Sequence, residues 1–129
     1  SALARVIFAD PQARADLNAI IHPLVRERAA ELEAAAPVGA VVVHVIPLLV
    51  ETGQQDRFDA VVVVDTTVEE QLRRLTRRDG LTQTEAEQRV AAQASREERL
   101  GAATHVIDSS GPVRETMRQV DELWQNLST

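Results

Sequence analysis

The sequence of 129 residues has no cysteine and no tyrosine. Without cysteine the chain forms no disulfide, offers no thiol nucleophile and ligates no metal through sulfur, and we expect a reducing compartment such as the cytoplasm. Its few aromatic residues, Phe8, Phe58 and Trp124, are too sparse to stack the bases of single-stranded nucleic acid. The net charge of −6 gives no electrostatic reason to bind DNA or an anionic membrane.

Lysine is absent as well, so all 14 basic residues are arginine, and the five glycines are isolated from one another. A glycine-rich loop that cradles a phosphate together with a lysine is therefore excluded from this sequence. The longest apolar runs are about five residues, against the roughly 20 that span a membrane. Residues 1–10 lack a secretory-signal core and an initiator methionine. We interpret the sequence as a processed or truncated chain, or one whose start is missing.

Three apolar segments have the length and composition of β-strands. Val41–Ile46 and Ala60–Val64 are almost continuously apolar, which is typical of parallel strands covered on both faces. Thr104–Ile107 is a weaker third strand. Helical patterns lie between and after these runs, so the order predicts an α/β layered fold.

The first predicted helix begins with Asp10 as its N-cap and Pro11 in its first turn. Apolar residues then recur at helical spacing as far as Leu32. Pro23 interrupts this pattern, and we expect a break or a kink near His22.

Two Thr-x-x-Glu sequences predict helices that begin at Thr66 and Thr82 with capping boxes. Gly80 is expected to end the first of these helices, and the second is expected to run towards Arg99. The last helix is expected to begin near Pro112. Its apolar stripe comprises Val113, Met117, Val120, Trp124 and Leu127.

Half of the arginines lie between residues 71 and 99, where the local net charge is positive. Arg74 and Arg78 are four residues apart on one helix face, and two like charges there cost a few tenths of a kcal/mol unless an anion joins them. A phosphate would suit the guanidinium forks. The alternative is a solvated helix pair with weak Arg–Glu bridges.

Polar residues follow the predicted strands, including the carboxylates of Glu51, Asp65 and Asp108. In open parallel sheets, ligands bind beyond the carboxyl ends of the strands, so these carboxylates are candidates for a shared Mg²⁺. They serve equally well as helix caps or turn residues. No Gly-x-Ser-x-Gly element is present, which leaves a serine hydrolase unsupported.

The three histidines, His22, His44 and His105, lack the spacing of a helical zinc site. His44 and His105 lie in predicted strands and are expected to be packed. His22, at the predicted helix break, is the one placed to point into a cleft, and the alternative for such a lone histidine is a structural role.

Taken in order, these segments resemble the C-terminal two-thirds of the dephospho-coenzyme A kinase family, and the resemblance covers essentially the whole sequence. Its most specific parts are Pro47–Glu51 and Ala91–Glu97. The other matching stretches are Ala4–Pro11, Leu17–Val25, Val62–Asp65, Gln71–Arg74, Arg78–Thr82 and Val106–Asp108.

The resemblance implies a partial P-loop-kinase fold in the α/β class, a three-layer sandwich with a parallel sheet, a helical substrate region and a helical lid. The chain would then be a single partial domain. Its regions would be a coenzyme A side over about 9–37, a core over about 40–67 and 101–129, and a lid over about 68–100.

The resemblance also implies site residues. Arg74, Arg78 and Arg96 match arginines that clamp the ATP phosphates and serve catalysis. Asp108 and Ser109 match the segment near adenine, where the family usually has asparagine in place of Ser109, so the contact with adenine loses an amide.

On the acceptor side, the resemblance implies that His22, Leu48 and Glu51 border the cleft for dephospho-coenzyme A. It implies no metal ligand in this sequence.

The family's N-terminal third, with its glycine-rich loop, lysine, Mg²⁺-binding hydroxyl and catalytic aspartate, has no counterpart in this sequence. We expect the intact enzyme to use ATP and Mg²⁺, and the chain alone to bind neither tightly and to be inactive. The alternative is a non-catalytic binding module derived from such a kinase. Because the loop-bearing strand is central in the family, Val41–Ile46 or Val61–Val64 would have a free edge, which predicts a homo-oligomer or a strand swap.

Overall fold

The computed structural model describes residue 3 and residues 9–128. The predicted family stretch at Ala4–Phe8 lies outside these residues. The chain divides into two compact units, residues 1–43 and 44–129.

The first unit contains the helix α2 (Pro11–Ala34). As predicted, Asp10 is its N-cap, and one carboxylate oxygen accepts hydrogen bonds from the backbone N–H groups of Gln12 (2.8 Å) and Ala13 (3.3 Å). These bonds satisfy two of the amide groups that every helix leaves free at its start.

Pro23 lies inside α2, which is continuous there, so a break near His22 is wrong, while the alternative expectation of a kink stays a prediction. A proline leaves the carbonyl four residues earlier, here that of Ala19, without its N–H partner. Ala19 is exposed, so water can satisfy its carbonyl and the helix continues. Most large apolar side chains of α2 are also exposed, with Ile20 at 64% and Leu24 at 59%.

Val41–Ile46, predicted as a strand, forms none in the structure. A strand needs a neighbour with which to share its N–H and C=O groups, and in the described part of the chain the two strands present pair with each other. Val43 and Val45 are largely exposed as a result.

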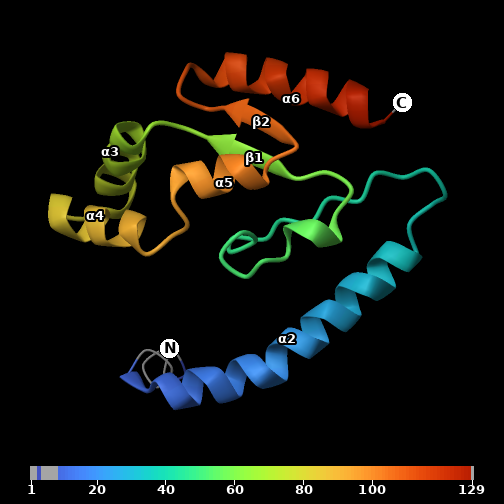
Figure 1. The fold of residues 1–129 in the computed structure, drawn as a ribbon, viewed down its shortest axis with the longest axis horizontal. Coiled ribbons are helices and arrows are strands. Elements are labelled where there is room, and N and C mark those ends of the chain that lie inside the picture. Colours follow the sequence, from blue (N-terminus) through green and yellow to red (C-terminus); the bar gives the residue numbers. More distant parts are fainter. Residues whose placement is uncertain (1–2, 4–8, 129) are drawn as a thin grey trace. The chain divides into compact units, whose positions relative to one another are not determined.

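The second unit is an α/β arrangement, as predicted (Figure 1). Its elements are η1 (Gln55–Arg57), β1 (Val62–Asp65), α3 (Val68–Asp79), α4 (Gln83–Ala91), α5 (Arg96–Ala102), β2 (His105–Asp108) and α6 (Val113–Leu127).

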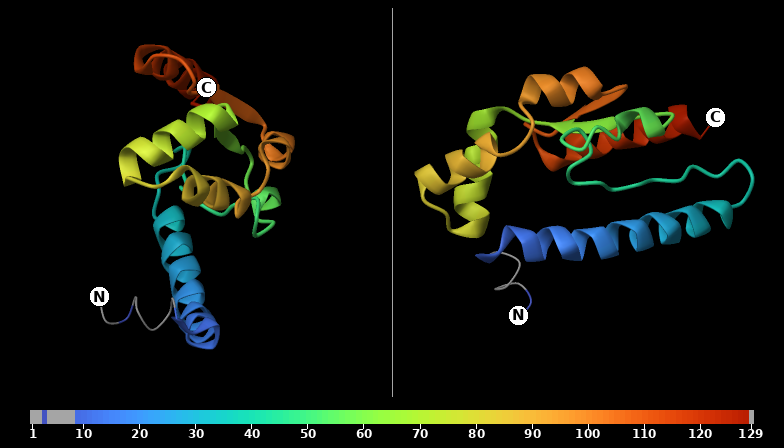
Figure 2. Two further views of the ribbon diagram at one scale, coloured as in Figure 1. Left: turned by 90° about the vertical axis from the view of Figure 1, so that its left-hand side faces the viewer. Right: turned by 60° about the horizontal axis from the view of Figure 1, so that its bottom comes forward.

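The strands β1 and β2 are parallel, with Val62 opposite His105 and Asp65 opposite Asp108. Helix α6 packs against β2 and helix α5 against β1 (Figures 1 and 2). The small core includes Val61 and Ile107, each 5% exposed. The predicted oligomer or strand swap stays a prediction.

The caps explain where α3, α4 and α5 begin. Helix α3 is capped by Thr67, whose hydroxyl accepts from the backbone N–H of Glu70, so the capping box expected at Thr66 is wrong. The Glu70 carboxylate accepts from Arg73 and Arg74. The box at Thr82 is confirmed. Gly80 ends α3 with a φ of 64°, a left-handed conformation that glycine adopts at no steric cost.

Helix α4 ends at Ala91, so the expectation of one helix running towards Arg99 is wrong. A second capping box, formed by Ser95 and Glu98, begins the separate helix α5. The four residues between α4 and α5 therefore form a loop, and this loop sets the position of Arg96.

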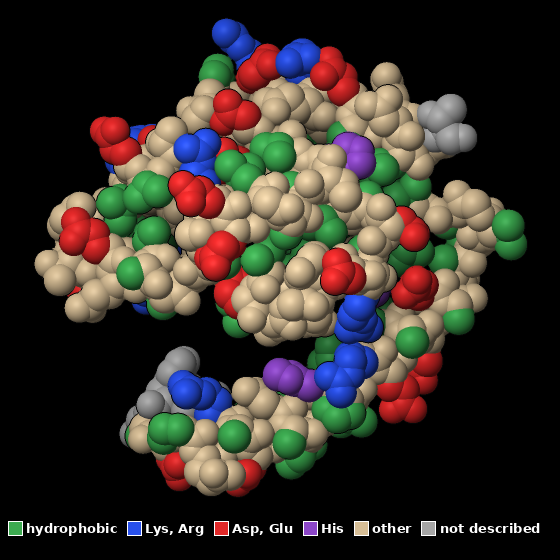
Figure 3. Space-filling model, viewed as in Figure 1, with side chains coloured by type: hydrophobic (Ala, Val, Ile, Leu, Met, Phe, Trp, Pro, Cys, Tyr) green, Lys and Arg blue, Asp and Glu red, His purple; other side chains and the backbone are tan. Residues whose placement is uncertain are grey.

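Helix α6 begins at Val113, close to where the sequence predicts it. Its predicted apolar stripe is partly exposed, with Trp124 at 53%. Acidic and basic side chains lie beside each other over α6 (Figure 3), where Arg118 pairs with Glu115 and Glu122.

Candidate functional site

The parallel register brings the carboxyl ends of the two strands together, with Asp65 directly opposite Asp108. Asp65 is buried, with 7% of its surface exposed. Ser109 bonds to the Asp65 carbonyl twice, through its backbone N–H (2.8 Å) and its hydroxyl (2.9 Å). The first residue after β2 is thereby fixed to the last residue of β1.

Arg96, the first residue of α5, forms a bidentate ion pair with the Asp65 carboxylate. Its Nε lies 2.9 Å from Oδ1 and its Nη2 lies 2.6 Å from Oδ2. The hydrogen bonds from Arg96 lower the pKa of Asp65, while burial and the nearby charge of Asp108 act in the opposite direction. The same pair raises the pKa of Arg96.

Arg74 reaches the same end of the sheet from α3. Its Nη1 donates to the Ser109 hydroxyl (3.2 Å) and its Nη2 to the Ser109 carbonyl (2.5 Å). Its Nε donates to Glu70 (2.7 Å). Arg74, Arg96, Asp65, Asp108 and Ser109 therefore meet where β1 and β2 end, and we call these five residues the strand-end cluster.

Arg78 does not join the strand-end cluster. Its guanidinium pairs with the carboxylate of the adjacent Asp79, at 2.7 and 3.0 Å, and its side chain is 76% exposed. Asp79 also accepts from Arg89 on α4, at 3.3 Å, which ties the two helices together.

Glu70 offers a direct test of these arginine contacts in solution. Hydrogen bonds from Arg73 and then Arg74 lower its pKa from 4.5 to about 2. We expect Arg73→Ala and Arg74→Ala each to raise the Glu70 pKa, with the larger rise for Arg73→Ala, as measured by NMR titration of the side-chain carboxyl. Glu85, whose pKa is lowered chiefly by Thr82, is the control that should not respond. A pKa of Glu70 near 4.5 in the unaltered chain would refute the contacts.

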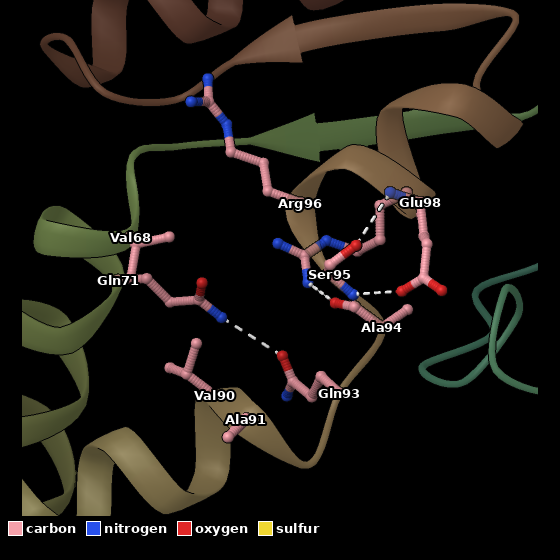
Figure 4. Close-up of a pocket in the computed structure, with 10 residues that line it drawn as sticks. Val68, Gln71, Val90, Ala91, Gln93, Ala94, Ser95, Arg96 and Glu98 are labelled. Atoms are coloured by element: carbon pink, nitrogen blue, oxygen red, sulfur yellow. Dashed lines mark hydrogen bonds between the residues drawn. The ribbon is translucent and has the colours of Figure 1, made fainter.

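A hollow of about 450 Å³ lies beside the strand-end cluster, between α3, α4 and α5 (Figure 4). Gln71 and Gln93 face each other across it, with 3.2 Å between the amide nitrogen and oxygen. Arg96 extends from the rim of the hollow towards the end of β1 (Figure 4).

The three predicted acceptor-side residues are placed differently. His22 lies on α2 in the first unit, exposed. Leu48 is 52% exposed in the turns before η1. The Glu51 carboxylate accepts a hydrogen bond from the backbone N–H of Ala94 (2.9 Å), a partner that the sequence did not reveal.

The described residues contain no group of three or more histidine, aspartate or glutamate side chains that could hold a metal ion. Asp65 faces Asp108, but its carboxylate is held by Arg96, and Glu51 is bonded to Ala94. The convergence of these three carboxylates on a metal, considered from the sequence, does not occur. None of the described helices is long and apolar enough to cross a membrane.

Comparison with solved structures supports the fold. The structure of TT1252 from Thermus thermophilus matches with a TM-score of 0.76 and 33% identity, over 98% of this chain and 65% of the other. The dephospho-CoA kinase from Campylobacter jejuni matches with a TM-score of 0.71 and 23% identity, over 98% and 63%. The α/β kinase fold expected from the resemblance is therefore confirmed.

Comparison of sequences identifies the family. A family model described as dephospho-CoA kinase matches residues 1–115. The dephospho-CoA kinase of Cutibacterium acnes is 51% identical over 131 residues, which cover 99% of this chain and 57% of the relative. That of Streptomyces avermitilis is 50% identical over 125 residues, covering 97% and 61%. The chain thus spans about three-fifths of the length of these relatives, and it belongs to the dephospho-CoA kinase family.

Proposed function

We propose that this chain supplies the lid, the acceptor side and part of the core of an enzyme that transfers the γ-phosphoryl group of ATP to the 3′-hydroxyl of dephospho-coenzyme A. The family and the names of the relatives support the reaction. The observation that carries the proposal is the approach of Arg74 and Arg96, from two different helices, to the carboxyl ends of two parallel strands.

Phosphoryl transfer depends mainly on positioning and on stabilising the charge that spreads over the phosphoryl oxygens. Arginine suits this task because its planar fork binds two phosphate oxygens at once. In the structure, Arg74 donates hydrogen bonds to the hydroxyl and the carbonyl oxygen of Ser109. Phosphate oxygens are stronger acceptors for the same donors, so an incoming nucleotide would compete for Arg74.

Arg78 would contribute to phosphate binding after the lid closes. It is exposed near the end of α3, and only the adjacent Asp79 holds it among the described contacts of its guanidinium. If the region of about 68–100 closes as a lid, Arg78 moves with it and adds a third guanidinium to the phosphates. Asp108 and Ser109 would then face the adenine side of the nucleotide.

The resemblance places His22, within the coenzyme A side of about 9–37, and Leu48 at the acceptor cleft. Glu51, which it also places there, holds the backbone N–H of Ala94 in the structure. The core would comprise about 40–67 and 101–129. Mg²⁺ is implied by the family, yet the described carboxylates do not fit it, because Asp65 is engaged by Arg96 and no cluster of three ligands exists among them. The metal ligands would come from the part of the relatives that this chain does not span.

A chimera tests the proposal, with the N-terminal segment of the Cutibacterium acnes relative joined ahead of this chain. We expect it to convert dephospho-coenzyme A to coenzyme A with ATP, detected by chromatography and mass of the product. The complete C. acnes protein is the positive control. Failure of the chimera on dephospho-coenzyme A, or a preference for nucleoside monophosphates as acceptors, would count against the assignment.

A further inference from the structure

In the loop between α4 and α5, both backbone groups of Ala94, its N–H and its carbonyl, form hydrogen bonds with side chains. The Ala94 N–H donates to Oε1 of Glu51 (2.9 Å), and the Ala94 carbonyl accepts from Nη1 of Arg99 (2.6 Å). The Ser95 N–H donates to Oε2 of Glu98 (2.7 Å), and its hydroxyl accepts from the Glu98 N–H (3.1 Å) (Figure 4). The next residue is Arg96, so the guanidinium of the strand-end cluster leaves the chain directly after this loop.

These bonds differ in what they fix. Arg99 and Glu98 belong to α5 itself, so their bonds shape the loop but move with the helix. Glu51 precedes η1 and lies 43 residues before Ala94 in the sequence. Among the described contacts, its bond is the one that ties the backbone of this loop to a part of the chain outside α3, α4 and α5.

We propose that Glu51 is a positioning residue for Arg96: by holding the Ala94 N–H, it fixes the start of α5 so that the guanidinium of Arg96 stands at the end of β1. Asp65 fixes the guanidinium at one end of the side chain, and Glu51 fixes the backbone near the other. The proposal rests on the proposed function, in which Arg96 binds phosphate.

The family resemblance implies a different role for Glu51, at the border of the acceptor cleft. The two roles predict opposite kinetics. A carboxylate that touches the acceptor mainly sets the KM for dephospho-coenzyme A, whereas a residue that positions Arg96 sets kcat, because Arg96 acts on the charge that develops during transfer. Glutamine separates the roles further, since its side-chain oxygen can still accept the Ala94 N–H although its charge is gone.

In the chimera, we expect Glu51→Ala to lower kcat by about tenfold to a hundredfold, the range in which a misplaced catalytic group costs rate, with little change in either KM. Glu51→Gln should stay close to the unaltered chimera. Glu51→Ala combined with Arg96→Ala should be no slower than Arg96→Ala alone, because both changes remove the same effect. Glu85→Ala is the matched control, as it also removes a glutamate that accepts a backbone N–H, at the start of α4.

A second measurement uses the 129-residue chain and needs no activity. The Nε–H NMR signal of Arg96, assigned by its loss in Arg96→Ala, reports the bond to Asp65 at 2.9 Å. We expect Glu51→Ala to shift or broaden this signal and Glu51→Gln to preserve it. If the alanine variant is unfolded by circular dichroism, Glu51→Asp provides a milder change, which should affect the signal in the same direction.

The outcomes separate this inference from the function on which it rests. An inactive unaltered chimera contradicts the proposed function, while the NMR signal still decides the role of Glu51. An Arg96 signal unchanged in Glu51→Ala and Glu51→Asp overturns the positioning role. So does a raised KM for dephospho-coenzyme A at unchanged kcat, or a glutamine variant as impaired as the alanine variant.

Discussion

Replacing Arg96 with alanine is expected to lower the Tm of the chain by several degrees, about 3–8 °C for a chain of this size. Asp65 is 7% exposed, so the substitution leaves a buried carboxylate without its hydrogen bonds from Arg96. The side chain of Arg96 is 42% exposed, and water therefore screens part of the pair, which keeps the loss below that of a fully buried pair.

The loss depends on pH in a direction fixed by the pKa of Asp65. Arg96 lowers this pKa in the folded chain below its ordinary value of 3.8, so the unfolded chain binds the proton more readily. The Arg96–Asp65 pair contributes fully to folding stability at a pH above the pKa of Asp65 in the unfolded chain. This contribution disappears as the pH falls through the pKa of Asp65 in the folded chain. The difference in Tm between the unaltered chain and Arg96→Ala should thus be constant near neutral pH and shrink below about pH 4.

Two further variants control this result. Asp65→Asn combined with Arg96→Ala removes the buried charge and should recover part of the lost Tm. Arg118→Ala removes an arginine whose pairs with Glu115 and Glu122 lie on the surface of α6, and it should change Tm little. An Arg96→Ala chain as stable as the unaltered one at pH 7 would show that the ion pair with Asp65 is not formed.

The strands show how far local sequence decides the fold. Val62–Asp65 and His105–Asp108 are strands, as their apolar runs predict, and they lie parallel. Val41–Ile46 has the same composition but forms no strand. Strand propensity acts within a segment, whereas a β-ladder needs a second segment beside it, and the described residues provide no neighbouring strand for this run.

Helix boundaries were harder to predict for a local reason. Thr66 and Thr67 are adjacent and both can cap α3, and the structure uses Thr67, leaving the buried hydroxyl oxygen of Thr66 without a partner in the described chain. The box of Ser95 and Glu98 is readable in the sequence by the same rule that identifies the one at Thr82, and it marks the start of α5.

The sequence predicts those parts of the candidate site that depend on the type and spacing of side chains. Residue type and spacing indicate Arg74, Asp65 and Asp108, and the family resemblance implies Arg96 and Ser109. The structure brings these five residues together. Arg78 shares the helical spacing of Arg74 but takes Asp79 as its partner, because helix spacing does not specify which neighbour a long side chain meets. The bond of Glu51 to Ala94 had no sequence signal, since its donor is a backbone N–H that every residue except proline carries.

The 129-residue chain alone is expected to form no detectable coenzyme A from ATP and dephospho-coenzyme A, under conditions in which the chimera is active. The sequence has no lysine and no clustered glycines to cradle the β- and γ-phosphates. Arginines that grip phosphate cannot replace the loop that aligns the attacked phosphorus with the acceptor, and alignment supplies much of the rate. The expected difference is therefore several orders of magnitude rather than a partial loss.

The assay follows radiolabelled phosphate from γ-labelled ATP into coenzyme A, using chain whose intact mass has been verified. Traces of the host's own kinase would give a false signal, and Arg96→Ala in the same chain controls for this, because contaminating activity does not depend on that residue. Turnover by the pure chain that Arg96→Ala abolishes would contradict the prediction. It would mean that the strand-end cluster, with Arg74 and Arg96 as its cations, aligns ATP without a glycine-rich loop.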